Sequence, residues 1–193
     1  MRMVNSTPAK VMGIGSPTRV LWVLGAVVAL LTLMRAQSPV AGEYQVKAAF
    51  LYNFAKFVEW PPGSFSDGSA PLRICVLGHD PFGEGLRDIT SRKTVNGREL
   101  RVDRVLDLQL ARTCHILFIA SSEKANLQRI LESLRGADLL TVGDTKGFVQ
   151  RGGVINFVLE DNRVLFEVNR KAAEQAGLKI SSKLLNVAKL VIE

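Results

Sequence analysis

The chain has 193 residues, of which 47% are hydrophobic and 22% are charged. This composition is typical of a folded globular protein and excludes an intrinsically disordered one. The formal net charge is +7, but four of the 25 basic residues lie within residues 1–42, which contain no Asp or Glu. The other 21 basic residues face 18 acidic ones, a balance of only +3 without a basic stripe. The sequence therefore predicts no nucleic-acid partner, because phosphate binding needs a concentrated positive surface.

The N-terminal stretch has the pattern of a signal peptide. A basic segment rich in Ser, Pro and Gly leads into an apolar block at residues 20–34, and small and polar residues follow up to Gly42. About 15 apolar residues are fewer than the roughly 20 that span a membrane. We predict that residues 1–42 direct export to the periplasm and that residues 43–193 form a single domain. An uncleaved N-terminal anchor is the alternative, because Met34 stands where a cleavage site before Gln37 would need a small residue.

The predicted elements begin with a helix at residues 43–60, in which Val46, Phe50, Phe54 and Phe57 have helical spacing and which Pro61 ends. Short apolar strands alternate with helices through the rest of the domain. Strands are expected at residues 72–77, 99–105, 114–120, 139–142, 154–159 and 163–168, and helices at 82–89, 123–134, 170–176 and 182–191. This order predicts a three-layer α/β fold of flavodoxin or Rossmann type. Its mostly parallel sheet of about six strands has helices on both faces and finishes in a C-terminal antiparallel hairpin.

The two cysteines, Cys75 and Cys114, lie in the first and third predicted strands. An even number of cysteines in an exported domain favours a disulfide over two buried thiols. These strands are neighbours in a sheet of flavodoxin order, so the bridge is also geometrically feasible.

No group of residues has the pattern of a catalytic or metal site. The glycine-containing turn at residues 78–85 lacks the spacing of a dinucleotide or phosphate loop, and His79 with Asp80 lacks a third group. His115 adjoins Cys114, but a zinc site would need all the histidines and cysteines of the chain to converge. We therefore predict a protein without enzymatic activity, metal or cofactor.

Several features point instead to binding. The first helix is apolar on nearly all sides, so it needs cover from its own core and from a second element or a partner. Phe148 lies among glycines, where it either folds back on the core or contacts a partner. Glu167 interrupts an apolar strand and either pairs with Arg163 or Arg170 or takes part in binding. The predicted partner-binding residues are Phe50, Phe57, Phe148, Arg163, Glu167 and Asn169. An apolar helix and a hairpin also predict a homodimer, which light scattering would test.

Several segments, taken together, resemble the YfiR family over about residues 44–192. They are YQVKAAFLYNFAKFVEWP at 44–61, RICVLG at 73–78, CHILFI at 114–119, GF at 147–148, GGVINF at 152–157 and ISSKLL at 180–185. The resemblance implies a periplasmic repressor that binds the periplasmic sensory domain of an inner-membrane diguanylate cyclase and lowers cyclic di-GMP and biofilm formation. It implies release under redox or envelope stress, or through an outer-membrane lipoprotein.

The resemblance also bears on the cysteines. Cys75 and Cys114 match one cysteine pair of the family, whereas Val149 and Asn156 stand where some members have a second pair. This leaves Cys75–Cys114 as a structural bridge and argues against redox switching at the second position. The alternative function is a periplasmic sensor that binds a small molecule, because glycine-rich loops lie at the predicted strand ends.

Overall fold

The computed structural model describes residues 39–193. The predicted signal peptide lies outside the described residues except for residues 39–42, which form the start of the first helix, α2 (Pro39–Phe57). Pro39 suits this position because proline has no amide hydrogen to satisfy and its φ angle is already helical. None of the helices in residues 39–193 combines the length and the hydropathy needed to cross a membrane.

Within the described residues, the main sheet has eight strands in the order β10-β8-β7-β6-β5-β2-β4-β3. Strands β4, β2, β5, β6 and β7 run parallel, and β7 and β8 form an antiparallel hairpin. All six predicted strands are present, and the first and third are neighbours, as expected for flavodoxin order. The strands are β2 (Leu72–Leu77), β3 (Thr94–Val95), β4 (Arg98–Val105), β5 (Ile116–Ile119), β6 (Leu140–Gly143), β7 (Ile155–Glu160), β8 (Arg163–Asn169) and β10 (Leu190–Ile192).

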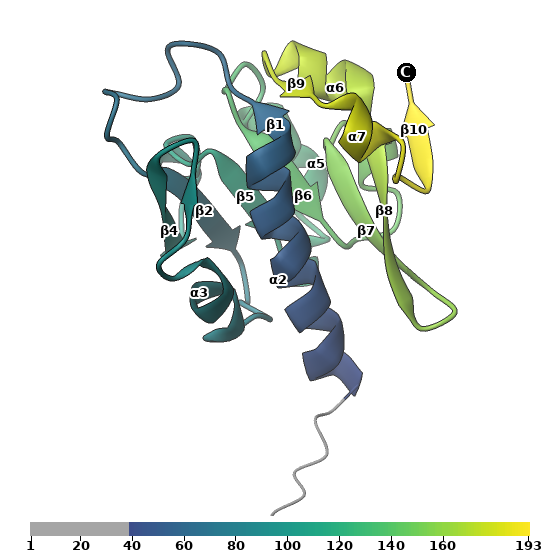
Figure 1. Ribbon diagram of the computed structural model, residues 1–193. Coiled ribbons are helices and arrows are strands. Elements are labelled where there is room, and N and C mark those ends of the chain that lie inside the picture. Colours follow the sequence, from purple (N-terminus) through teal and green to yellow (C-terminus); the bar gives the residue numbers. More distant parts are fainter. Residues whose placement is uncertain (1–38) are drawn as a thin grey trace, which may run out of the picture. The chain divides into compact units, whose positions relative to one another are not determined.

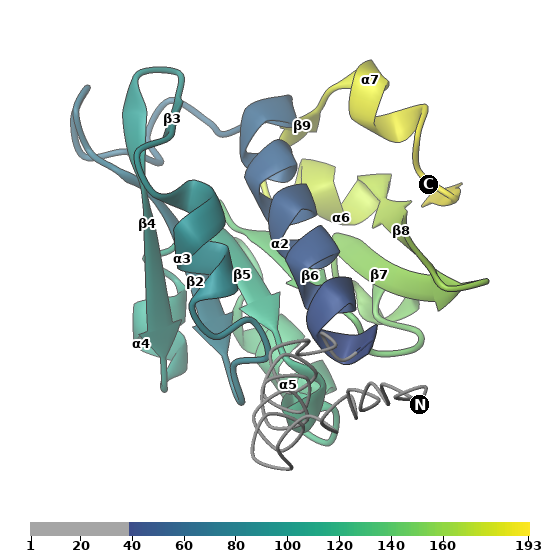
Figure 2. The ribbon, with the colours of Figure 1, turned by 60° about the horizontal axis from the view of Figure 1, so that its bottom comes forward.

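Helices cover both faces of this sheet, which confirms the predicted α/β fold (Figure 1). The long helix α2 crosses one face beside α3 (Gly85–Thr90), and α5 (Leu127–Ser133) lies behind the sheet, as the rotated view also shows (Figure 2). The shorter helices are α4 (Leu108–Ala111), α6 (Arg170–Gln175) and α7 (Ser182–Leu185), with 3₁₀ turns η1 (Ser121–Glu123) and η2 (Val149–Arg151). A separate antiparallel pair joins β1 (Val58–Glu59), at the end of α2, to β9 (Lys179–Ile180).

Two hydrophobic cores lie on opposite faces of the sheet because successive strand residues point to opposite faces. In β2, Ile74 packs in the core under α2, whereas Cys75 packs in the core under α5. Phe118 and Leu117 of β5 divide in the same way. The strands are apolar at almost every position because both of their faces are buried.

The predicted helix at residues 182–191 is wrong in its second half. Helix α7 ends at Leu185, and the chain then forms β10, whose residues Val191 and Ile192 pair in parallel with β8. The edge of β8 offers unpaired backbone groups, and β-branched residues suit a strand. The predicted helix at residues 123–134 is also shorter than expected, because α5 begins only at Leu127, after η1 and a turn at residues 124–126.

Candidate functional site

Cys75 and Cys114 form the predicted disulfide, with their Cα atoms 6.1 Å apart. Cys75 lies in the centre of β2, next to β5, and both half-cystines are buried in the core under α5. We call this core, with its bridge, the disulfide core. A bridge of this kind fits an oxidising compartment such as the periplasm.

Phe148 belongs to the disulfide core and has an exposed fraction of 0%. Its ring lies between Gly143 and Gly153, where an added Cβ atom would come within 2.5 Å and 2.0 Å of the ring, respectively. The prediction that Phe148 contacts a partner is therefore corrected. The Phe148 ring fills the space left by two glycines and packs on the core, which was the alternative interpretation. This packing explains the glycines at 143 and 153.

A network of buried polar side chains lies at the carboxyl end of β6, where open α/β sheets bind ligands. Asp144 follows β6 directly, and Tyr44 and Lys47 reach it from the first turns of α2. The Lys47 ammonium lies 2.8 Å from Asp144 Oδ2, and the Tyr44 hydroxyl donates a 2.7 Å hydrogen bond to the same oxygen. Lys47 also lies over the Tyr44 ring, 4.2 Å from its centroid. The buried carboxylate of Asp144 is thus paired through one oxygen only.

The protonation of Tyr44 follows from this arrangement. Burial raises the pKa of Tyr44 well above its usual range, and the hydrogen bond to Asp144 and that residue's negative charge raise it further. The phenol therefore remains a hydrogen-bond donor to Asp144 throughout the physiological pH range.

Two buried acceptors in this region have no hydrogen-bond donor. Asp144 Oδ1 and Asn156 Oδ1 are the only buried side-chain nitrogen or oxygen atoms of residues 39–193 without a partner. Asn156 lies on β7 opposite Glu167 of β8, and its amide donates a 3.3 Å hydrogen bond to Glu167 Oε2. Buried acceptors of this kind are uncommon in folded proteins, since each loses its hydrogen bonds to water.

Both of these residues line one cavity of about 510 Å³. Glu167 and the loop after β6 form further parts of its wall, and three successive hairpin residues contribute an apolar side. The complete lining is Asp144, Lys146, Gly147, Gln150, Asn156, Phe157, Val158, Leu159 and Glu167. We call this cavity, together with Tyr44 and Lys47 behind Asp144, the strand-end site.

A second cavity, of about 440 Å³, lies between α5 and α6. Arg135 and Arg151, both exposed, contribute its charged groups, and none of the unpartnered buried atoms found in residues 39–193 belongs to its lining. The strand-end site is therefore the stronger candidate for a binding site.

The remaining predicted partner-binding residues lie in different parts of the fold. Phe50 is half-buried on α2 and packs against the rings of Phe157 and Phe166 at centroid distances of 6.0 and 5.5 Å. Phe57 lies at the other end of α2, partly buried against the same core. Arg163 is exposed at the start of β8.

Asn169 and Glu167 also differ in role. The Asn169 side chain caps α6 by accepting from the Ala172 amide and donates to the Val149 carbonyl, so both of its polar groups are engaged within the fold. Glu167 lines the strand-end site, and no Lys or Arg of residues 39–193 forms an ion pair with it, including Arg163 and Arg170.

His115 is a structural residue that directly precedes β5 and packs on the loop leading into β2. Its Nδ1 accepts a hydrogen bond from the Arg73 amide at 3.0 Å, and its Nε2 lies 3.0 Å from the Ser64 carbonyl, which can only accept. The ring therefore carries its hydrogen on Nε2, is neutral, and stacks on Phe65 at 4.2 Å between centroids. Burial lowers the pKa of His115, and the positive charges of Arg73 and Arg98 lower it further. Both ring nitrogens are thus engaged within the protein.

Sequence reasoning identified Glu167 but missed Tyr44, Lys47, Asp144 and Asn156. The signal was available for two of them, since Lys47 interrupts an apolar helix and Asn156 an apolar strand, as Glu167 does. Polar residues at core positions often mark function, because they conflict with the surrounding pattern.

The comparisons with known proteins agree with the resemblance noted in the sequence. A family model for a domain of unknown function, described as YfiR/HmsC-like, matches residues 44–189. The chain belongs to this family. The YfiR/HmsC-like family is periplasmic and regulatory rather than catalytic, and a buried disulfide fits an oxidising compartment.

No curated protein matches the chain. Among solved structures, a conserved domain protein from Vibrio cholerae O1 biovar El Tor is similar, with a TM-score of 0.54 and 12% identity. That match covers 75% of this YfiR/HmsC-like chain and 60% of the Vibrio protein, so the chain spans less than two thirds of that protein. An ABC domain from Streptococcus pneumoniae, in complex with L-Trp, aligns with a TM-score of 0.47 and 11% identity over 62% of this chain and 55% of its own. The Vibrio likeness supports the α/β fold alone.

Proposed function

We propose that this YfiR/HmsC-like protein binds the periplasmic sensory domain of an inner-membrane diguanylate cyclase and holds the cyclase inactive. The proposal rests on family membership for the signalling system and on one surface feature for the binding. Repression of the cyclase would lower cyclic di-GMP and biofilm formation.

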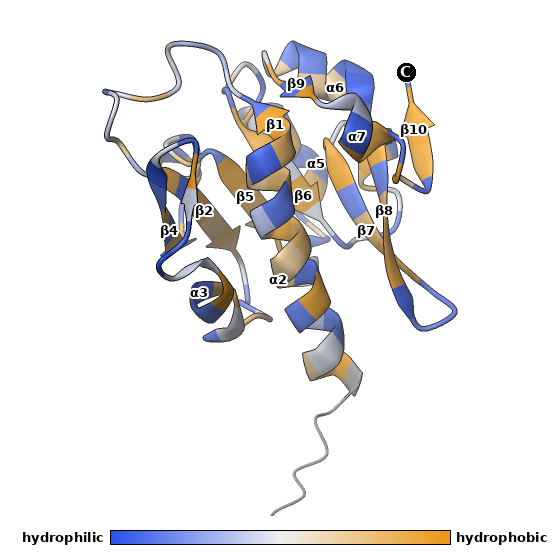
Figure 3. Ribbon diagram, viewed as in Figure 1, coloured by the Kyte–Doolittle hydropathy of each residue, from blue (hydrophilic) through white to orange (hydrophobic). Residues whose placement is uncertain are grey.

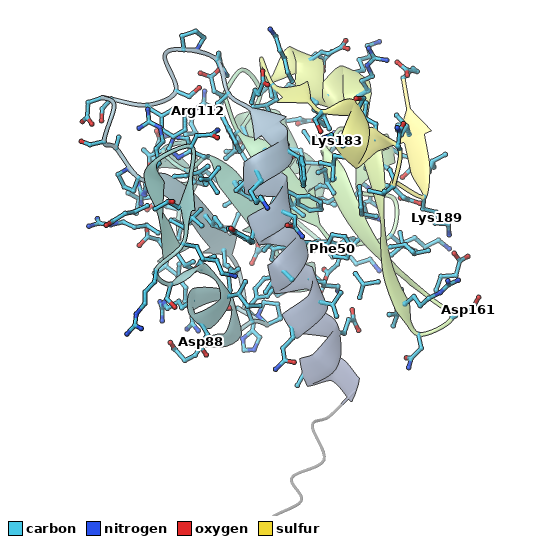
Figure 4. The ribbon with its side chains drawn as sticks, viewed as in Figure 1. Phe50, Asp88, Arg112, Asp161, Lys183 and Lys189 are labelled. Carbon is cyan, nitrogen blue, oxygen red and sulfur yellow. A yellow bond between two sulfur atoms is a disulfide. The ribbon has the colours of Figure 1, made fainter. Side chains whose placement is uncertain are left out.

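The feature is an apolar strip on α2 and the β7–β8 hairpin, which we call the hairpin strip. It consists of Val46, Phe50, Leu159 and Val164, of which Val46 is 45% and Leu159 is 51% exposed. Leu159 and Val164 are paired across the hairpin, on the face that carries Phe157 and Phe166. Figure 3 shows the apolar colouring along both strands of the hairpin, and Figure 4 shows Phe50 on the side of α2 toward them.

The strip has the properties of the centre of a protein interface. Adjacent exposed apolar side chains on rigid elements are uncommon on a protein that works alone, and aromatic residues are enriched where partners bury surface. Charged groups lie at the end of the hairpin, where Lys189 pairs with Glu160, the last residue of β7, at 3.0 Å. Figure 4 labels Lys189 and Asp161 on this side of the protein. An apolar centre with a charged rim matches the usual anatomy of a transient interface.

Deletion of the gene in its host, with quantification of cyclic di-GMP, tests the proposal. We expect cyclic di-GMP to rise on deletion and to return to normal with the full chain, but not with a chain lacking residues 1–42. An unchanged level on deletion would overturn repression as the function.

A matched pair of variants tests the surface. Leu159→Asp should fail to restore repression, because a carboxylate would have to be buried in the interface. Leu106→Asp is the control, since Leu106 is 91% exposed in the loop after β4, away from the hairpin strip. Co-purification of the exported protein with the cyclase should be lost for the first variant and kept for the second. Equal repression by both variants would exclude the hairpin strip as the contact surface.

A further inference from the structure

We propose that the strand-end site binds a small organic cation that carries a protonated amine, with Asp144, Asn156 and Glu167 as the groups that recognise it. The proposal does not depend on cyclase repression, because the site and its chemistry are properties of this chain alone.

The first argument is the location of the unpartnered acceptors. A buried acceptor without a donor is destabilising, so folded proteins keep few of them. The only two such side-chain atoms of residues 39–193, Asp144 Oδ1 and Asn156 Oδ1, belong to residues that line the same cavity. The side chain of Asp144 is 6% exposed and Asn156 is 3% exposed, so both are held in the wall rather than in open solvent. Both oxygens have almost no exposed surface, so a hydrogen-bond donor in the cavity would satisfy them once the Asp144 and Asn156 side chains turn toward it.

The second argument sets the ligand's chemistry. Both free atoms are oxygens that can only accept, so the ligand must donate. Tyr44 and Lys47 hold the other Asp144 oxygen and keep the carboxylate in place. An anion is disfavoured at such a wall, because it would bring acceptors and negative charge against a carboxylate.

The third argument distinguishes a cation from a neutral donor such as an alcohol. Glu167 forms part of the same wall and has no ion-pair partner among residues 39–193, and its contact there is the Asn156 amide. An ammonium group would pair with this carboxylate and donate to the two free oxygens, and hydrogen bonds of this kind are about twice as strong as neutral ones. Lys146 also borders the cavity, but it is exposed, so water and salt screen its charge.

The rest of the cavity suits an aliphatic chain. Phe157, Val158 and Leu159 supply an apolar wall, and the volume of about 510 Å³ admits a small molecule. The inferred ligand class is therefore an amine cation with a short apolar body.

The test uses three probes of similar shape on the exported protein: n-butylammonium, 1-butanol and butyrate. We expect n-butylammonium to raise the melting temperature in proportion to its concentration, because a ligand that binds only the folded state stabilises it. Butanol and butyrate should produce a much smaller shift or none. Equal shifts with all three probes, or no shift with n-butylammonium, would overturn the proposal. Water would then be the group that donates hydrogen bonds to the two oxygens.

Variants locate the binding. Asn156→Leu removes one unpartnered acceptor at similar volume, so the protein should stay folded while its affinity for n-butylammonium falls about tenfold or more. Glu167→Gln keeps the shape and removes the charge, and it should also weaken binding even if Asn156→Leu folds poorly. Glu99→Gln, at an exposed position of β4 opposite Thr94 of β3, is the matched control and should bind like the original protein. Unchanged binding by Glu167→Gln would exclude the strand-end site. These binding experiments contain no cyclase, so failure of the repression proposal would not affect their result.

Discussion

The disulfide core and the strand-end site are both buried, but the first is built from apolar side chains and the second from polar ones. In the disulfide core, apolar side chains of β2, β5 and α5 surround a covalent bridge, and Phe148 fills the space beside two glycines. In the strand-end site, the Lys47 ammonium and the Tyr44 phenol meet the Asp144 carboxylate at the end of β6, and Asp144 Oδ1 and Asn156 Oδ1 remain unpartnered.

This difference separates stability from recognition. Apolar packing and a cross-link stabilise one structure without reference to any other molecule. Buried polar groups are stabilising only when every member is satisfied, so an incomplete network is costly to keep. The incomplete polar network lies at the end of the sheet where open α/β folds commonly bind ligands, whereas the region around the disulfide is apolar. Four measurements test this contrast, and the first concerns the bridge itself.

Replacement of both Cys75 and Cys114 by Ala should lower the free energy of unfolding by about 4 kcal/mol, since the bridge closes a loop of 39 residues in the unfolded chain. Chemical denaturation of the purified protein would measure the change. Reduction of the original protein should produce a similar loss. A loss below about 1 kcal/mol would show that packing alone holds the disulfide core.

Lys47→Met should lower the free energy of unfolding by about 3 kcal/mol, because it leaves the Asp144 carboxylate buried without its cation. Lys146→Met is the control, since Lys146 is exposed at the same cavity and its replacement should change stability by no more than about 0.5 kcal/mol. Urea unfolding of both variants would compare them. Equal effects would mean that the buried ion pair is not what stabilises this end of α2.

Gly153→Ala should destabilise the protein by about 2 kcal/mol, because the new methyl group would occupy the space of the Phe148 ring. Gly68→Ala, where nothing lies within 4 Å of the added atom, should have little effect. Thermal unfolding would compare the two. Similar melting temperatures for both variants would show that the Phe148 ring can move aside within the core.

The smallest effect is expected from pH. The folded state lowers the pKa of His115, so between the unfolded value of about 6.5 and the lower folded value the unfolded chain binds more protons. This contribution to stability is complete above about pH 6.5 and is lost as the pH falls toward the folded pKa. His115→Gln should therefore flatten the dependence of unfolding free energy on pH between about 7 and 5.5. An unchanged pH dependence in His115→Gln would contradict this assignment.

Much of this architecture could be predicted from the sequence because it depends on local patterns. Apolar runs bounded by turn residues located all six main strands, and the alternation of strands and helices implied parallel pairing and the neighbouring positions of Cys75 and Cys114. Two of the expected helices also begin after a capping side chain, since Asn169 and Ser181 each accept a hydrogen bond from a backbone amide at the helix start.

Only the tertiary structure decided the last strand and the strand-end site. Residues 190–192 have a pattern compatible with a helix, and they form β10 because the edge of β8 supplies hydrogen bonds that local sequence does not contain. Tyr44 and Asp144 lie 100 residues apart in the chain, so no spacing rule relates them. Sequence periodicity reports which side of an element is buried, whereas a site of this kind depends on which buried polar groups meet and which of them remain without a partner.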